Sequence, residues 1–252
     1  MTGRTTVITG AAGGIGSAIA RRLAPECANL VLVDRSTDLL TGLIAELSGS
    51  ATRVRGIGVD LSQRSQLSGF FSEVEKSTDG VDILVNNAGV SLKLDGRTMK
   101  SWEITPSDWR MVMEVNLTAP FLLARYWLPG MKKRGWGRII NMASAGGRQG
   151  SKFASPSYGA SKTALIGLSR RLAVEAGPFG VTVNCVAPGR IQTPLLRGKD
   201  EQQSTLQYLK RVPARRIGLP EDVANAVAFL ASDAASYVVG ATVDVNGGAF
   251  MG

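Results

Sequence analysis

Apolar residues occur along this chain in two alternating patterns, which predict strands that alternate with helices. Short runs rich in β-branched and other apolar residues are followed by longer segments whose apolar residues recur every three or four positions. The predicted strands are Thr5–Thr9, Leu30–Val33, Val54–Val59, Ile83–Val85, Arg138–Asn141, Val181–Cys185 and Thr242–Val245. Because these runs are almost continuously apolar, we expect an α/β fold with a doubly wound parallel sheet of about seven strands and helices on both faces.

The helical segments carry recognisable start signals. They are predicted at Ser17–Ala24, Leu39–Leu47, Pro106–Met131, Pro156–Ala176 and Pro220–Leu230, with a further amphipathic helix before Ile83. Thr105 and Asp108 resemble a capping box, and Ser155 is a candidate N-cap before Pro156. Residues 195–216 are polar and only weakly periodic, which favours a mobile lid over a substrate.

Length and composition favour one domain. The chain has 252 residues, of which 44% are hydrophobic, and no linker, repeat or low-complexity run divides it. We therefore expect residues 1–252 to form a single domain. The sequence has neither a charged, cleavable leader nor an apolar span of roughly 18 residues, which predicts a cytoplasmic protein without a membrane segment.

Charge and the rare residue types narrow the function classes. Lys and Arg outnumber Asp and Glu by 29 to 20, which suits nucleic acid or an anionic substrate. No helix-turn-helix, aromatic platform or dense basic stripe accompanies the charge, so we favour a solvated basic surface and expect no nucleic-acid partner. The chain has no histidine, and Cys27 and Cys185 lie in unrelated segments, which argues against a zinc site and excludes a histidine-based triad.

A glycine-rich turn joins the first predicted strand to the first helix. Its glycines allow a tight turn, close approach of the backbone to a pyrophosphate, and close helix packing, with the helix N-terminus facing the anion. This strand, turn and helix predict a Rossmann-like dinucleotide site. Its candidate cofactor-binding residues are Gly10, Ala12, Gly13, Gly14, Ile15 and Gly16.

Asp34 follows the second strand, about 20 residues beyond the glycines, where its carboxylate can accept hydrogen bonds from an adenosine ribose. A 2′-phosphate would lie against that carboxylate and be repelled by roughly 4 kcal/mol per unit charge at an effective dielectric near 20. Arg35 could offset part of this repulsion or point to solvent. We expect NAD as cofactor, with NADP less favoured.

Further candidate cofactor residues follow the third and fourth strands. Asp60, next to Leu61, could hold an adenine amino group or cap a helix. In the NNAG segment we expect Asn86 to bridge strand backbones. The next three residues are predicted to line the adenosine ribose: Asn87, Ala88 and Gly89.

A phenol and an ammonium are predicted on one face of a helix, because Tyr158 and Lys162 are four residues apart. A phenol with an ordinary pKa of about 10 needs a shift of two to three units to act near neutrality, and a neighbouring ammonium shifts it in that direction. Ser144 follows the Arg138–Asn141 strand, where its hydroxyl can hydrogen-bond a carbonyl or an alkoxide.

These segments together resemble the short-chain dehydrogenase/reductase family over essentially the whole chain. The matching features, in order, are TGAAGGIG, Asp60, NNAG, Asn116, Ser144, YGASK and PGRIQTP. The resemblance implies a nicotinamide-dependent oxidoreductase with a catalytic tetrad of Asn116, Ser144, Tyr158 and Lys162. Asn116 would anchor a water beside Lys162, and Lys162 would also bind the nicotinamide ribose.

The same resemblance extends to the nicotinamide side and to assembly. Pro188 and Gly189 would turn the chain, while Ile191 and Thr193 would lie against the nicotinamide and its carboxamide. A homotetramer is implied, formed through the two long helices. Their candidate interface residues are Val112, Val115, Phe121, Leu122 and Leu168, for which burial within one subunit is the alternative.

Substrate choice rests on departures from one subgroup, the 3-oxoacyl-carrier-protein reductases. Arg134 matches a carrier-docking residue of that subgroup, but Asp34 and Phe179 do not fit it, and the segment 91–107 with Trp102 is longer. We therefore favour an NAD-linked dehydrogenase of a small secondary alcohol or sugar. The alternatives are an acyl reductase and, more remotely, a catalytically silent NAD-sensing protein.

Two basic residues lie between Ser144 and Tyr158. Arg148 and Lys152 could border the substrate pocket and bind an anionic substrate, or they could simply be exposed on a loop. We favour exposure.

Overall fold

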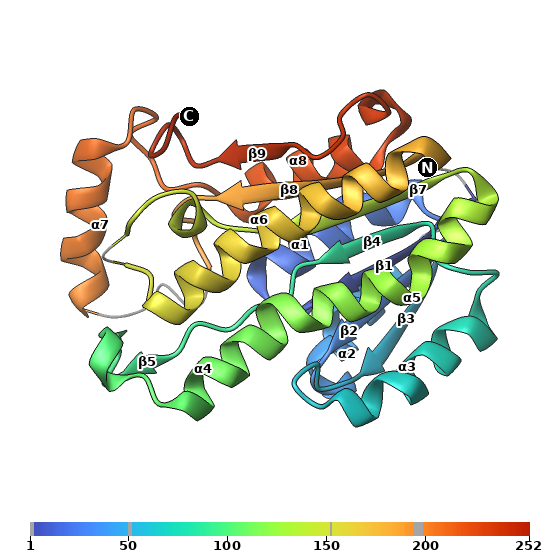
Figure 1. Cartoon of the computed structure of the whole chain (residues 1–252), viewed down its shortest axis with the longest axis horizontal. Coiled ribbons are helices and arrows are strands. Elements are labelled where there is room, and N and C mark those ends of the chain that lie inside the picture. The colour runs from blue at the N-terminus through green and yellow to red at the C-terminus, as the bar shows by residue number, and fades with distance from the viewer. Residues whose placement is uncertain (1–2, 50–51, 152, 194–198) are drawn as a thin grey trace.

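The computed structural model describes residues 3–49, 52–151, 153–193 and 199–252, with side chains for all of these except 199–204. A seven-stranded parallel sheet runs through the molecule in the order β3-β2-β1-β4-β7-β8-β9 (Figure 1). The strands are β1 Thr5–Thr9, β2 Asn29–Asp34, β3 Arg53–Gly58, β4 Ile83–Asn86, β7 Gly137–Met142, β8 Val181–Pro188 and β9 Thr242–Val245. Strand order reverses between β1 and β4, so a crevice is expected at their carboxyl ends.

Helices cover both faces of this sheet, as the sequence predicts. One face carries α1 (Gly14–Leu23), α2 (Thr41–Leu47) and α8 (Pro220–Ala231), and the other carries α3 (Arg64–Ser77), α5 (Ala119–Arg134) and α6 (Pro156–Ala176). Two further helices are α4 Pro106–Met113 and α7 Lys199–Arg211. The chain also forms short helices at η1 Ala24–Glu26, η2 Thr37–Leu40, η3 Ser101–Glu103, η5 Ala145–Gly147, η6 Gly177–Phe179 and η7 Asp233–Ala235.

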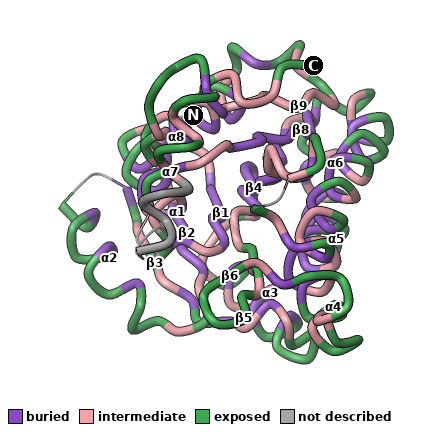
Figure 2. Tube along the Cα trace, turned by 90° about the vertical axis from the view of Figure 1, so that its left-hand side faces the viewer, coloured by how far each residue is buried: buried purple, intermediate pink, exposed green. Residues whose placement is uncertain are grey.

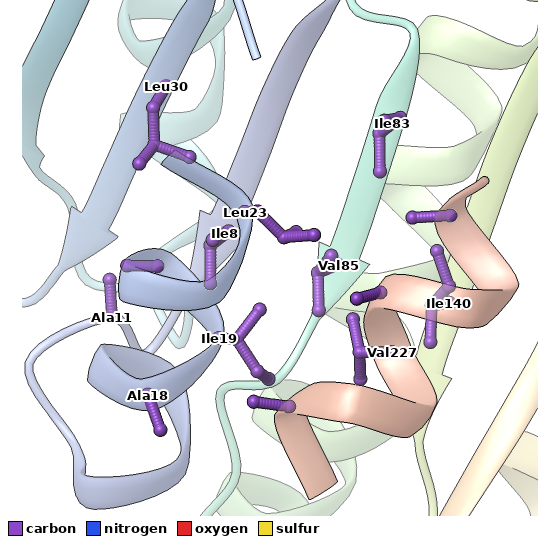
Figure 3. Packing of buried hydrophobic residues seen from close by; sticks show 14 of the residues in the cluster. Ile8, Ala11, Ala18, Ile19, Leu23, Leu30, Ile83, Val85, Ile140 and Val227 are labelled. Carbon is purple, nitrogen blue, oxygen red and sulfur yellow. The ribbon is translucent and has the colours of Figure 1, made fainter. Parts of the chain in front are cut away.

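Alternation along the central strands divides the core into two layers. Ile8 and Ile140 point towards α1 and α8, whereas Val7 and Ile139 belong to the layer under α3, α5 and α6. Figure 3 shows Ile8 and Ile140 with Ile19 in the first layer. The strands of the sheet interior are buried on both sides (Figure 2). This two-sided packing holds the strand ends in fixed positions, and the candidate site is built on those ends.

The helix predicted at Pro106–Met131 is interrupted. The capping box of Thr105 and Asp108 is confirmed, but α4 ends at Met113 and a π-helical turn, η4 Glu114–Thr118, precedes α5. The amide of Ala119 donates to the carbonyl of Glu114, five residues back. Pro120 has no N–H to donate to the carbonyl of Asn116, so regular helical bonding cannot continue there.

The region predicted as a lid contains the helix α7, whose last turn is anchored. The Tyr208 hydroxyl donates to the Asn246 carbonyl at 3.2 Å, and the Ala214 amide donates to the Gly247 carbonyl at 3.0 Å. Val212 is buried. Residues 195–198 of the predicted lid lie outside the described part of the chain. Mobility of this region stays a prediction.

The segment between β4 and α4 forms a small hairpin, β5 Lys93–Leu94 with β6 Arg97–Thr98, followed by η3. Thr98 donates its hydroxyl to the carbonyl of Phe153 at 3.4 Å, so the hairpin contacts the loop between Ser144 and Tyr158. In the described part of the chain, no helix is both long enough and apolar enough to cross a membrane.

Candidate active site

Ser144, Tyr158 and Lys162 come together at the carboxyl end of β7. The helix α6 begins as predicted, with Pro156 as its first residue and the Ser155 hydroxyl accepting a hydrogen bond from the Tyr158 amide at 3.4 Å. Tyr158 and Lys162 therefore lie one turn apart at the start of α6. The Ser144 hydroxyl lies close enough to the Tyr158 phenol for a hydrogen-bonding interaction that lowers the pKa of the phenol.

Ser144 is oriented by the turn that it begins. Its hydroxyl oxygen accepts a hydrogen bond from the Gly146 amide at 3.1 Å, which makes Ser144 the N-cap of η5. A serine hydroxyl has one donor and two lone pairs, and this capping bond uses one lone pair. The hydroxyl proton remains available for the Tyr158 oxygen or for a substrate oxygen.

Lys162 is a buried ammonium. Only 3% of the residue is exposed, and its Nζ donates to the Met142 carbonyl at 2.7 Å. Burial lowers the pKa of Lys162 to about 8. A Cβ at Gly89 would lie 3.2 Å from this Nζ and 3.4 Å from Asn116 Oδ1, so Gly89, Asn116 and Lys162 meet at one point.

Two influences act on the Tyr158 phenol in opposite directions. Burial raises the pKa of Tyr158, and the hydrogen bond from Ser144 lowers it. The sequence predicts that Lys162 does the lowering, but its ammonium lies 5.8 Å from the centre of the Tyr158 ring and is bonded to a backbone carbonyl. Ser144 therefore favours the ionised phenol, and the contribution expected from Lys162 stays a prediction.

Asn116 lies in the π-helical turn and is completely buried. Its Oδ1 accepts from the Val90 amide at 2.8 Å, and its Nδ2 donates to the Val90 carbonyl and to the Ser161 hydroxyl, each at 3.0 Å. Ser161 in turn donates to the Tyr158 carbonyl at 2.7 Å. Sequence reasoning missed Ser161, although its place three residues after Tyr158 puts it on the same side of α6.

The glycine-rich turn has the shape expected of a dinucleotide cradle. Gly10 has φ +64°, and a Cβ on it would lie 2.8 Å from Ala88 Cα; a Cβ on Gly16 would lie 2.1 Å from the Gly10 carbonyl oxygen. The helix α1 begins at Gly14, and no side chain caps it at Gly13. The first N–H groups of α1 are therefore oriented as pyrophosphate donors, and the residues present fit a dinucleotide.

Asp34 ends β2 beside this turn. Its Oδ2 accepts from the Ala12 amide at 3.0 Å and its Oδ1 from the Arg35 amide at 2.8 Å. The carboxylate is therefore fixed next to the cradle, with lone pairs left for ribose hydroxyls. The Arg35 side chain is exposed.

Asp60 closes a turn rather than capping a helix. Its Oδ1 accepts from the Ser62 amide at 2.9 Å and from the Ser62 hydroxyl at 2.8 Å. The helix α3 starts at Arg64 with Gln63 as its N-cap, so the alternative of a helix cap is wrong for Asp60. Leu61 is buried beside it.

The two asparagines of NNAG have roles different from those expected. Asn87, not Asn86, bridges strand backbones, because its Nδ2 donates to the carbonyls of Thr9 and Gly10, each at 3.0 Å. Asn86 donates instead to the Asn141 side chain at 2.7 Å. Adjacent residues of a strand point to opposite faces, and the sequence does not reveal which face needs the amide.

The last predicted cofactor residues follow β8. Pro188 is the final residue of that strand, and Gly189 begins the turn. Ile191 is buried and forms an isolated parallel bridge with Gly218, while Thr193 is half-buried. Because β7 and β8 are neighbouring parallel strands, this segment leaves the sheet at the same carboxyl end as Ser144; Figure 1 shows the two strands side by side.

Arg134 lies at the opposite end of the sheet from these residues. Its Nε contacts Asp82 Oδ1 at 3.2 Å and its Nη2 donates to the Val81 carbonyl at 2.5 Å, beside a hollow of about 340 Å³. Phe179 is partly exposed and lies 3.9 Å from the Lys132 ammonium. Arg134 is thus bonded within its own subunit.

Arg148 is not an exposed loop residue, so the favoured expectation is wrong. Its side chain is 15% exposed and forms an ion pair with Asp244 at 3.1 Å. The guanidinium also donates to the Gly252 carbonyl and lies 4.8 Å from the centre of the Phe250 ring. Lys152 lies outside the described residues.

Comparison with known proteins gives the same picture over the full length. A family model described as enoyl-(acyl carrier protein) reductase matches residues 10–249. Nodulation protein G of Rhizobium sp. (strain N33) is 42% identical over 251 residues, covering 100% of this chain and 98% of the relative.

Solved structures agree. The crystal structure of a 3-oxoacyl-[acyl-carrier protein] reductase with bound NAD from Brucella melitensis has a TM-score of 0.91 and 36% identity, covering 99% of this chain and 92% of that one. A structure from Beutenbergia cavernae, proposed to be an NAD(P)-dependent gluconate 5-dehydrogenase and holding NADP at low occupancy, has a TM-score of 0.88 and 38% identity, covering 98% and 97%. With the parallel sheet, the glycine cradle and these matches together, the chain belongs to the short-chain dehydrogenase/reductase family and is an oxidoreductase acting on CH–OH or keto groups.

Proposed function

We propose that this oxidoreductase uses NAD to interconvert a small secondary alcohol or sugar and its ketone, with Asn116, Ser144, Tyr158 and Lys162 as catalytic residues. One observation carries the proposal. The Ser144 hydroxyl lies close enough to the Tyr158 phenol to lower its pKa, at the carboxyl end of the parallel strands, where the glycine turn also lies. The pair can hold one substrate oxygen and move one proton to or from it.

In the oxidative direction the Tyr158 phenolate accepts the hydroxyl proton, and in reduction the phenol returns it. Ser144 donates its hydroxyl hydrogen to the substrate oxygen and stabilises negative charge there. A nicotinamide cofactor held at the glycine turn would supply the hydride chemistry. Lys162, with a pKa of about 8, is mostly protonated at neutral pH and keeps a positive charge beside this centre.

Cofactor choice is assigned to Asp34. Its carboxylate lies beside the glycine turn, bonded to the Ala12 amide, and would accept hydrogen bonds from both ribose hydroxyls of NAD. A 2′-phosphate would meet a like charge there. The remaining cofactor contacts are proposed for the glycine turn, Asp60, the backbone of Asn87–Gly89 and the segment Pro188–Thr193.

The 3-oxoacyl-carrier-protein reductase activity is the second candidate. The Brucella melitensis structure and other relatives bear that description, which favours it. Against it, the Arg134 guanidinium is engaged by Asp82 and the Val81 carbonyl, and Phe179 supplies no positive charge. A secondary hydroxyl of a sugar acid such as gluconate agrees with the Beutenbergia cavernae neighbour.

The deciding experiment is a substrate panel followed at the absorbance of reduced nicotinamide. The purified chain is assayed with NAD⁺ and NADP⁺ against secondary alcohols and sugars, and with both reduced cofactors against a 3-oxoacyl thioester. NAD-linked oxidation of a small alcohol or sugar supports the proposal. Turnover only of the thioester with NADPH would establish the acyl reductase instead.

Assembly and architecture belong to the same proposal. We propose one domain over residues 1–252, a substrate lid around residues 195–216, a homotetramer and a cytoplasmic location. The anchored end of α7 at Tyr208 and Val212 gives such a lid a fixed hinge.

A further inference from the structure

Arg148 lies at the end of the turn that Ser144 begins, and it is held by residues from the far end of the chain. Its Nη2 donates to Asp244 Oδ2 at 3.1 Å and to the Gly252 carbonyl. Its guanidinium also packs against the Phe250 ring at 4.8 Å. With both side chains of the ion pair mostly buried, at 15% and 20% exposure, this is a fixed contact rather than a solvated surface pair.

The turn between Ser144 and Arg148 is short and internally bonded. The Gly147 amide donates to the Ser144 carbonyl at 2.9 Å, and the Arg148 amide donates to the Ala145 carbonyl at 3.1 Å. The Gly146 amide donates to the Ser144 hydroxyl at 3.1 Å. Because these bonds link almost every residue of the turn, an anchor at Arg148 also fixes the Ser144 hydroxyl.

The opposite side of the turn rests directly on α6. A Cβ at Gly147 would lie 2.8 Å from the Lys162 carbonyl carbon, and Thr163 donates its hydroxyl to the Gly147 carbonyl at 2.8 Å. The turn is therefore held between the helix that carries Tyr158 and β9 with the segment that follows it. Arg148 is the charged contact on the second side.

We infer that Arg148, through its ion pair with Asp244, is a positioning residue that holds the Ser144 hydroxyl against Tyr158. The inference rests on the proposed function, because it assigns Ser144 a role in turnover. We do not assign Arg148 to recognition of an anionic substrate, because its charge is already paired with the Asp244 carboxylate in a mostly buried ion pair.

Kinetics separate positioning from substrate recognition. Arg148→Ala should lower kcat by about tenfold to a hundredfold, the loss expected for a misplacement of about 1 Å. KM should change equally for a neutral secondary alcohol and its carboxylated analogue, such as 2-butanol and 3-hydroxybutyrate, and the NAD dissociation constant should stay unchanged. In a Ser144→Ala background the further loss should be less than about threefold, because Arg148 acts through Ser144.

The pH profile of kcat/KM also tests whether Arg148 positions Ser144, because positioning and a simple loss of charge shift the pKa of Tyr158 in opposite directions. The titratable groups on the elements packed around the turn include Lys162 on α6, Cys185 on β8 and Asp244 on β9. In Asp244→Ala, loss of a negative charge alone would lower the pKa of Tyr158. Displacement of Ser144 would instead remove the interaction that lowers the pKa of Tyr158. If Arg148 and Asp244 position Ser144, the acidic limb of kcat/KM should therefore move to higher pH in Asp244→Ala.

A control and a readout without turnover complete the test. Arg55→Ala removes another ion pair, Arg55–Glu73 at 2.8 Å, between β3 and α3, and should leave kcat unchanged. Ser144→Cys provides a thiol whose alkylation by iodoacetamide reports its position, since Cys27 and Cys185 are buried. Adding Arg148→Lys, or Arg148→Ala where that variant folds, should change the alkylation rate by about threefold or more.

Each contrary result is informative. If KM rises only for the carboxylated substrate, Arg148 is a substrate contact. If Arg148→Ala lowers kcat as much in the Ser144→Ala background as in the wild type, Arg148 does not act through Ser144. Either result overturns the inference. An unchanged alkylation rate also overturns it. A wild-type chain without any oxidoreductase turnover would reject the proposed function, while the alkylation readout would still judge the position of residue 144.

Discussion

In the proposed mechanism, proton transfer at the substrate oxygen depends on the ionisation of the Tyr158 phenol. Burial opposes ionisation of Tyr158, and the Ser144 hydrogen bond favours it. Lys162 is buried too, and its ammonium is satisfied by the Met142 carbonyl. Burial at this site therefore disfavours both the Tyr158 phenolate and the Lys162 ammonium, and such perturbed pKa values are common at catalytic centres.

Replacing Tyr158 by Phe should abolish turnover while leaving NAD affinity nearly unchanged. Only the oxygen is lost, and the ring can still pack at the start of α6. A decrease in kcat of at least about a thousandfold is expected from loss of the acid–base group. Steady-state kinetics and fluorescence titration with NADH measure the two effects. Normal turnover would remove Tyr158 from the mechanism.

Lys162→Met should stabilise the fold while it destroys activity. The pKa of Lys162 falls from 10.5 to about 8, so the charged form is disfavoured by burial. Below pH 8 the full penalty applies; as pH rises towards 10.5 the folded chain has already lost the proton, and the penalty disappears. We expect a gain of roughly 1–3 kcal/mol at pH 7 and a smaller one at pH 10. Urea unfolding at both values tests this, and a gain that grows with pH would contradict it.

Asp34→Ser should weaken the preference for NAD. We expect the wild type to favour NAD over NADP by at least about a hundredfold in kcat/KM, because the carboxylate repels a 2′-phosphate. The variant should bind NAD more weakly and NADP more strongly, since the exposed Arg35 can then attract the phosphate. Kinetics with both cofactors on both proteins decide the matter. A wild type that prefers NADP would show that positive charge outweighs Asp34.

At the scale of elements, the site is built where regular structure stops. The glycine turn ends β1, the Ser144 turn ends β7, and the π-helical turn at Glu114–Thr118 interrupts a long helix to bury Asn116. Arg64 donates to Glu114 through Nε and Nη2 at 2.5 and 2.7 Å, which links the start of α3 to this turn. Each irregular segment is held from outside by contacts far apart in sequence.

Gly16→Ala should damage the cofactor site, whereas Gly42→Ala should not. A Cβ at Gly16 would lie 2.1 Å from the Gly10 carbonyl, so the turn must shift, while a Cβ at Gly42 in α2 meets nothing within 4 Å. NADH affinity should fall at least about tenfold in the first variant. The second should gain about 0.5–1 kcal/mol of stability, because alanine favours a helix. Equal NADH binding by both variants would exclude Gly16 from the cradle.

Sequence patterns were sufficient for the seven strands of the main sheet and for most of the long helices, but not for the β5–β6 hairpin, the π-helical turn or the contacts between elements. The strands and the start of α6 follow from local apolar periodicity and caps, which act over a few residues. The π-helical turn depends on Pro120 and on Val90, which lies 26 residues from Asn116. The Arg148 ion pair spans 96 residues, and no local pattern reports it. Long-range pairings of this kind decide which polar residue is buried.

At the scale of the whole molecule, the two core layers leave several large apolar side chains on the surface. Val112 and Val115 are buried within the subunit, which is the alternative to the interface position expected for these two residues. Leu122 and Leu168 pack partly against the core under α5 and α6. Phe121 remains 41% exposed.

The proposed homotetramer therefore depends on the exposed part of the long helices. Trp109 and Met111 on α4 are exposed to 41% and 42%, close to the value for Phe121 on α5, and these exposed apolar side chains are the candidate contacts with further copies of the chain. We expect the mass of four chains in light scattering at micromolar concentration. Phe121→Glu should lower that mass, because a carboxylate buried at an interface without a partner is strongly unfavourable.

Leu39→Glu is the matched control for this prediction, since Leu39 is 54% exposed on η2, away from α4 and α5. It should leave the mass unchanged, which would separate a specific interface from a general effect of added negative charge on a chain with net charge +9. If both variants stay tetrameric, the contact lies on another surface. If the wild type is monomeric, the exposed side chains of α4 and α5 do not form an interface at all, and the proposed assembly is wrong.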